Sequence, residues 1–212
     1  MNNDLNPDIK SARQDRLVYN PSLDGLRAVA VILVVFYHTR VGVFPGGFIG
    51  VDVFFVLSGY LITSILRAEV RTTGTVDLLS FYWNRLLRLY PPLILMLTAW
   101  ALLIPFIYPG FETFRNGAIA LFYLSDYVMA FGRLYGHLSH TWSLAVEEHF
   151  YMVWPLIILA TRRLSDQQLF VGFAIFCALA TTWRIVDFAL WDSWRITYYR
   201  FDTRMALSLI HI

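Results

Sequence analysis

The chain has little charge, one cysteine and one lysine. Only 15% of its 212 residues are charged, whereas 58% are hydrophobic. This balance excludes an ordinary soluble domain and indicates a protein that crosses a membrane several times. Cys177 is the single cysteine, so an intrachain disulfide and a cysteine-based metal site are both excluded. Lys10 is the single lysine, and no basic block suits nucleic acid, so we expect no nucleic-acid partner.

Long apolar runs and aromatic residues are what the chain has in abundance. Aromatic residues make up 17% of it and include seven tryptophans, as expected where rings gather at membrane interfaces. A run of about 20 apolar residues can cross a bilayer. The sequence therefore predicts an all-α fold, a polytopic transmembrane helix bundle with about six spans. The predicted spans are 26–44, 48–66, 90–108, 117–132, 143–161 and 168–190.

Basic residues predict how these spans are oriented. The tail, residues 1–19, carries three of them, and four arginines lie between the second and third spans. Because basic residues favour the cytoplasmic side, the N-terminus is predicted to be cytoplasmic. Six spans then place Arg162 and Arg163 on the outer side, against the same rule, so the fourth or fifth span is open to question.

Arg27 and His38 are the ionisable pair of the first apolar run. On a helix their spacing of eleven residues corresponds to about three turns and a rise of roughly 16 Å. The two side chains therefore lie on nearly one stripe, with Arg27 at a membrane end and His38 well inside. Because ionisable groups at bilayer depth are costly, this pair is a candidate functional site. A histidine that only packs in the core is the alternative.

Two other helices carry polar side chains in regular spacing. Arg85 and Arg88 are three residues apart just before Pro91 and Pro92, which are predicted to open the third helix. Ser143, Glu147 and Tyr151 are spaced four residues apart and form one polar stripe.

Four stretches, taken together and in this order, resemble the acyltransferase-3 family of membrane acyltransferases, which includes O-antigen and peptidoglycan O-acetylases. They run from Leu23 through His38, from Gly47 to Ile62, from Phe81 to Pro91 and from Thr141 to Tyr151. The resemblance implies a domain of about ten spans in a bacterial inner membrane, of which this chain is the N-terminal part. It also implies that an acyl group, acetyl above all, passes from acyl-CoA on the cytoplasmic side to a hydroxyl of an envelope glycan or lipid-linked sugar. No tightly bound cofactor is expected, and acyl-CoA is a substrate.

The resemblance also implies roles for individual residues. His38 is the expected catalytic base or acyl relay. Glu147 either orients His38, as the acid of a triad does, or pairs with an arginine. Arg27, Arg85 and Arg88 are expected to bind the donor, because guanidinium groups suit phosphates; topology signals are the alternative.

Three further residues and one departure from the family pattern complete the candidate set. Asp52, Ser143 and Tyr151 are candidates for acceptor binding or for structural roles, and Asp52 can equally cap its helix. His149 stands where the family commonly has glutamine, which leaves the local hydrogen-bond network open.

Two rival functions are weighed against this one. A transporter of a small anionic substrate would also be a helix bundle with buried charges. A metal enzyme would need ligands from the set His137, His140, Glu147, Glu148 and His149, whose spacing matches no compact metal motif; we expect no metal.

The domain limits follow from the same features. We expect a cytoplasmic tail at 1–19 and the N-terminal part of the membrane acyltransferase domain at 20–206. The residues from Leu207 to Ile212 resemble a translated sequencing adapter, which predicts an artefact at 207–212.

Overall fold

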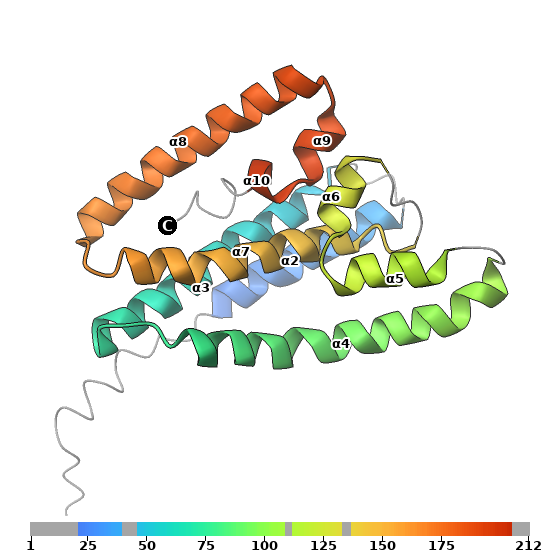
Figure 1. Cartoon of the computed structure of the whole chain (residues 1–212), viewed down its shortest axis with the longest axis horizontal. Coiled ribbons are helices and arrows are strands. Elements are labelled where there is room, and N and C mark those ends of the chain that lie inside the picture. The colour runs from blue at the N-terminus through green and yellow to red at the C-terminus, as the bar shows by residue number, and fades with distance from the viewer. Residues whose placement is uncertain (1–20, 40–45, 109–111, 133–136, 205–212) are drawn as a thin grey trace, which may run out of the picture. The chain divides into compact units, whose positions relative to one another are not determined.

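The computed structural model describes residues 21–39, 46–108, 112–132 and 137–204. All regular structure in these ranges is helical (Figure 1). The expected tail and the expected adapter residues, 207–212, lie outside the described residues. The helices are α2 (Pro21–His38), α3 (Ile49–Thr73), α4 (Leu78–Ile107), α5 (Thr113–Leu121), α6 (Ser125–Ala130), α7 (Thr141–Ala160), α8 (Asp166–Trp191), α9 (Trp194–Tyr199) and α10 (Phe201–Arg204).

The chain forms two compact units. In its described part, the first contains α2, α3, the end of α7 and the start of α8, from Pro155 to Phe173. The second contains α4, α5, α6, α7 up to Trp154, the rest of α8, α9 and α10.

Five helices of the described chain are long and apolar enough to cross a membrane: α2, α3, α4, α7 and α8. The predicted span at 117–132 is wrong, because that segment divides into α5 and α6. Tyr123 interrupts it with a positive φ of 54°, a conformation that ends a helix. The two pieces have nine and six residues, or roughly 14 Å and 9 Å of helix, against about 30 Å of bilayer core.

An ion pair within the first unit supports the five-span count. Arg67 and Arg71, at the end of α3, contact Asp166, at the start of α8, at 2.6 Å and 2.9 Å. The end of α3 and the start of α8 therefore lie on the same side of a membrane. This requires an even number of crossings between them, which α4 and α7 supply. A further span at 117–132 would have put these charges on opposite sides.

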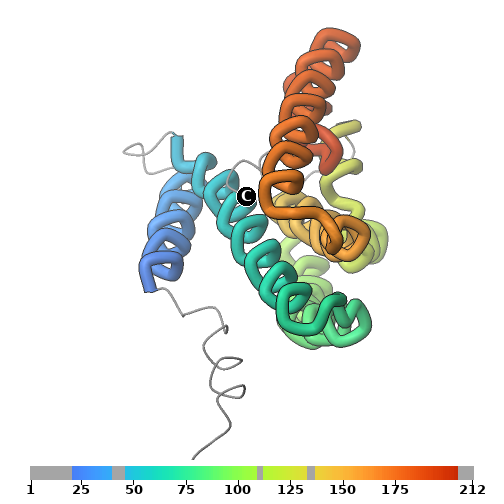
Figure 2. The backbone as a smooth tube through the Cα atoms, turned by 90° about the vertical axis from the view of Figure 1, so that its left-hand side faces the viewer, coloured from blue at the N-terminus to red at the C-terminus, as the bar shows by residue number. Residues whose placement is uncertain are grey.

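The first two helices form a hairpin that depends on close backbone contact (Figure 2). A Cβ atom on Gly50 of α3 would lie 2.4 Å from the carbonyl oxygen of Ala30 in α2, and one on Gly47 would lie 2.2 Å from that of Leu33. Only glycine permits this approach, as is common where membrane helices pack.

Helix α4 begins twelve residues before the predicted third span. Asp77 caps it by accepting a hydrogen bond from the backbone N–H of Ser80 at 3.0 Å. Pro91 and Pro92 therefore lie inside a 30-residue helix, not in its first turn as predicted. Arg85 and Arg88 are then about 10 Å and 15 Å along the helix from its start.

The hydrophobic core of the second unit forms between α4, α5 and α7. Its buried members are Leu93, Leu97, Ala120, Tyr123, Leu138 and Ala145. Large apolar side chains elsewhere are exposed, along α8 above all, as expected where a helix meets lipid or further membrane helices.

Candidate functional site

His38 and Arg27 both belong to α2, as predicted, but His38 is the last residue of the helix and not deep within it. Its Nδ1 lies 2.8 Å from the carbonyl oxygen of Val34, and its ring is exposed. Arg27 pairs with Asp24 at 3.1 Å. By helix geometry, both side chains lie roughly 80° from the centre of the face that packs on α3. They are therefore accessible beside the hairpin.

A polar cluster joins α4 to α7 in the second unit. The Arg85 guanidinium stacks on the Tyr151 ring, 3.4 Å from its centroid. The Tyr151 hydroxyl donates a hydrogen bond to Glu147, so the glutamate and the arginine share one tyrosine. Stacking on an aromatic face is a role that suits arginine in a desolvated place.

Two more groups complete the cluster. Glu148 is buried beside Arg85 and Tyr123, close enough for electrostatic interaction with both. Burial, together with the charge of Glu148 and the neighbouring Tyr90, raises the pKa of the Tyr123 hydroxyl. The hydroxyl therefore stays protonated and can donate a hydrogen bond. We call Arg85, Tyr123, Glu147, Glu148 and Tyr151 the α4–α7 cluster.

The Glu148 carboxylate and the Tyr123 hydroxyl both retain unused hydrogen-bonding capacity. Glu148 Oε1 and the Tyr123 hydroxyl are buried without a hydrogen-bond partner in the described structure. Because buried polar atoms are nearly always satisfied, these two invite a bound polar group or water.

The other predicted site residues take different positions. Ser143 donates to the His140 carbonyl at 3.3 Å, within the predicted stripe of α7. Arg88 is exposed, although Arg85 beside it is not. Asp52 does not cap α3, because the capping position is Phe48 and Asp52 lies inside the first turn. The capping alternative for Asp52 is therefore wrong.

The predicted partnership of His38 and Glu147 joins residues of different units. His38 belongs to the first unit and Glu147 to the second. Within its own unit, Glu147 meets Tyr151 and, through it, Arg85. The partnership with His38 stays a prediction.

A buried carboxylate–imidazole pair escaped the sequence analysis. Asp126 of α6 is fully buried, and its Oδ2 lies 3.3 Å from Nδ1 of His149 on α7. The rings of Tyr127 and Phe201 flank the imidazole. His149 departs from the family pattern, whereas Asp126 lies in a segment that the sequence predicts to be a membrane span.

A second polar network lies at the end of α8, around Asp187. Asp187 is buried and accepts hydrogen bonds from Thr197 at 3.0 Å and from Arg200 at 2.7 Å. Partial burial lowers the pKa of Arg200, but the carboxylates of Asp202 and Asp187 outweigh it and raise that pKa. Arg200 therefore stays charged and ties α9 to α8.

The described residues contain no group of three or more histidine, cysteine or acidic side chains that could hold a metal ion. The set considered for a metal enzyme forms no such group either: His137, His140, Glu147, Glu148 and His149. The described residues do contain a carboxylate, that of Glu147, which accepts a hydrogen bond from the Tyr151 hydroxyl within an otherwise apolar helix.

Five apolar spans, with charged groups packed between two of them, define a polytopic membrane protein of the helical-bundle class. Residues 20–208 match the family model described as an acyltransferase domain, and the chain belongs to that family, acyltransferase-3. No solved structure matches the chain.

Curated relatives agree with this assignment. The chain is 37% identical over 199 residues to the peptidoglycan O-acetyltransferase OatA of Listeria monocytogenes, covering 88% of this chain and 32% of that protein. It is 39% identical over 209 residues to the O-acetyltransferase OatA of Staphylococcus aureus strain NCTC 8325, covering 91% of this chain and 34% of that protein. The chain thus spans about a third of the length of these relatives.

Proposed function

We propose that the protein takes part in moving an acetyl group from acetyl-CoA, on the cytoplasmic side, to a hydroxyl of a cell-envelope carbohydrate on the outer side. The observation that carries this proposal is the α4–α7 cluster, in which Arg85, Tyr151 and Glu147 are linked inside apolar helices. Charge within membrane-spanning helices is costly and marks functional sites. The relatives named for peptidoglycan O-acetylation favour a glycan acceptor.

The orientation proposed for the chain places the N-terminus in the cytoplasm. With five spans, Arg162 and Arg163 lie on the same side as Arg67 and Arg71. The turn between α7 and α8 then lies on the cytoplasmic side, as the positive-inside rule requires, whereas six spans would have put it outside. The end of α4, the start of α7 and the end of α8 face outward in this orientation, into the space where a bacterial envelope glycan is found.

The proposed chemistry uses His38 as base or relay. As base, the neutral imidazole takes the proton of the acceptor hydroxyl while that oxygen bonds to the thioester carbonyl carbon. The carbon–sulfur bond breaks, and the departing thiolate takes the proton from His38. As relay, the imidazole nitrogen first displaces the thiolate and then passes the acyl group to the hydroxyl. Both routes convert acyl-CoA and an alcohol into an ester and free coenzyme A.

The remaining residues have supporting roles in this proposal. Arg27, Arg85 and Arg88 bind the phosphates of the donor. Glu147 stabilises either the His38 imidazolium or the Arg85 guanidinium. Asp52, Ser143 and Tyr151 either bind the acceptor or have structural roles.

The test compares wild type with His38→Ala, expressed from the complete gene in a host that lacks envelope O-acetylation. Ester-linked acetate on purified surface glycan is expected with wild type and not with the variant, at equal protein abundance. His140→Ala, which removes an exposed histidine from the turn before α7, is the matched control and should retain acetate. Equal acetate from His38→Ala would remove His38 from the mechanism. If wild type gives no ester-linked acetate and releases no coenzyme A, the acyltransferase proposal is contradicted.

A further inference from the structure

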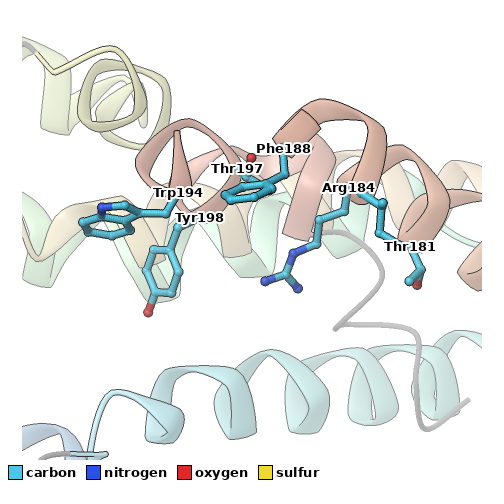
Figure 3. Close-up of a pocket in the computed structure, with 7 residues that line it drawn as sticks. Thr181, Arg184, Phe188, Trp194, Thr197 and Tyr198 are labelled. Carbon is cyan, nitrogen blue, oxygen red and sulfur yellow. The ribbon is translucent and has the colours of Figure 1, made fainter. Parts of the chain in front are cut away.

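A groove of about 480 Å³ lies between α8 and α9 of the second unit (Figure 3). Its lining is mostly apolar or aromatic, with one arginine. The lining residues are Thr181, Arg184, Ile185, Phe188, Trp194, Thr197 and Tyr198.

The groove forms because the chain reverses at the end of α8. Asp192 takes a positive φ of 45°, and α9 turns back obliquely from the end of α8 (Figure 1). The bonds from Thr197 and Arg200 to Asp187 hold α9 in place. The α8 side of the groove is one helix face, since Thr181, Arg184, Ile185 and Phe188 follow the spacing of neighbouring turns.

The rings of Trp194 and Tyr198 form one end of the groove, which we call the aromatic wall. The Arg204 guanidinium lies 3.8 Å from the centroid of the Tyr198 ring, and Arg204 Nε donates to the Tyr198 carbonyl oxygen at 2.7 Å. The Trp194 ring lies 6.1 Å from that of Tyr198. Amphipathic rings at the end of a membrane helix mark the headgroup level of a bilayer.

Arg184 lies deeper than this wall. It is seven residues before the end of α8, or about 10 Å along the axis. Figure 3 shows its side chain and that of Tyr198 projecting to the same side. At 26 residues, or roughly 39 Å, α8 exceeds the bilayer core of about 30 Å. The Arg184 head can therefore reach the phosphate level while its stem stays in the apolar zone.

We infer that this groove binds an anionic phospholipid of the surrounding membrane. The Arg184 guanidinium contacts the phosphate, for which its fork geometry is suited. Trp194 and Tyr198 frame the headgroup, and a hydrocarbon chain runs along Ile185 and Phe188. A soluble sugar fits less well, because the side chains beside Arg184 are chiefly apolar. The inference does not depend on the acyltransferase proposal.

The test reconstitutes the purified chain in phosphatidylcholine bilayers and measures quenching of tryptophan fluorescence by brominated lipids. We expect brominated phosphatidylglycerol to bind about fivefold more tightly than brominated phosphatidylcholine, as one basic residue near the surface allows. Arg184→Gln should bring the ratio close to one. Arg184→Lys, which keeps the charge but loses the fork, should give an intermediate ratio and serves if the glutamine variant does not fold.

Arg115→Gln is the matched control, since Arg115 is an exposed arginine that pairs with Glu112 outside the groove. It should keep the wild-type ratio. An equal fall in Arg115→Gln would mean that net charge alone sets the preference and would overturn the inference. So would an unchanged ratio in Arg184→Gln, or displacement of the lipid by soluble glycerol 3-phosphate.

Discussion

Tyr151 links two charged residues that the sequence placed on separate helices. Its hydroxyl donates a hydrogen bond to Glu147, and its ring stacks against the Arg85 guanidinium. A hydrogen bond to a charged group contributes about 1.5–3 kcal/mol, more than one between neutral groups. The tyrosine is therefore a positioning residue for the α4–α7 cluster, and its two interactions can be separated by mutation.

Tyr151→Phe keeps the ring under Arg85 and removes the hydroxyl from Glu147. We expect acetate transfer to fall by about tenfold or more, with protein abundance unchanged. The readout is ester-linked acetate on surface glycan, normalised to protein. Tyr82→Phe is the matched control, because the Tyr82 hydroxyl also donates to α7, at 2.8 Å, but to the backbone carbonyl of Met152. Equal losses in both variants would argue against a special role for the Glu147 bond.

The Asp126–His149 pair predicts a coupling between two residues. The two atoms lie 3.3 Å apart without forming a hydrogen bond, so their coupling is that of a close polar contact at a buried site. In a cycle of Asp126→Asn, His149→Leu and the double variant, we expect a coupling free energy of about 1–3 kcal/mol. Unfolding in mixed micelles with increasing dodecyl sulfate measures it. Additive single effects would show that the 3.3 Å contact has no energetic weight.

At the scale of elements, the α2–α3 hairpin depends on glycine for its packing. The close neighbours of Gly50 and Gly47 are backbone carbonyl oxygens, not flexible side chains. A methyl group there cannot be accommodated by a rotamer change, so the helices must move apart. The same hairpin carries Arg27 and His38, and a shift in it would move both.

Gly50→Ala is expected to destabilise the protein by about 1–3 kcal/mol, as overpacking does. Gly172→Ala in α8 is the control, because a Cβ atom there meets nothing within 4 Å. That change should be neutral or stabilising by up to about 1 kcal/mol, since alanine favours helix. Thermal unfolding in detergent compares the two. Equal behaviour of the variants would show that α2 and α3 are not in close contact.

At the scale of the whole molecule, the number of spans decides which groups share a side of the membrane. Five spans put the turn between α7 and α8 on the same side as the Arg67 end of α3, and they put α5, α6 and α9 on the other side. The Asp126–His149 pair near α6 and the Asp187–Arg200 pair near α9 then lie on one side of the membrane. Six spans would instead put the turn between α7 and α8 on the side opposite to the Arg67 end of α3, against the ion pair with Asp166.

This topology can be tested with single cysteines, because Cys177 is the only native one and can be replaced by alanine. In that background, Arg162→Cys should resist a membrane-impermeant maleimide in intact cells and react after lysis. Ser193→Cys, in the turn between α8 and α9, should react in intact cells. The reverse pattern would contradict the proposed orientation or the five-span count, because six spans with a cytoplasmic N-terminus also put Arg162 outside. Reaction of both in intact cells would show that α8 does not cross the membrane.

The sequence by itself determined the class of the fold, most of its spans and the family. Apolar runs of sufficient length have few alternatives to helices in a bilayer, because backbone groups must be satisfied internally. The adjacency of Glu147 and Tyr151 was equally readable, since it follows from helix periodicity alone.

Tertiary structure decided what periodicity cannot express. The left-handed Tyr123 ended a segment whose composition suited a span, and the Asp77 cap started α4 well before its prolines. Which arginine lies on Tyr151, which carboxylate meets His149 and which arginines pair with Asp166 all depend on contacts between distant helices. Helix periodicity fixes the face on which a side chain lies, whereas its partner depends on how that face packs against the rest of the chain.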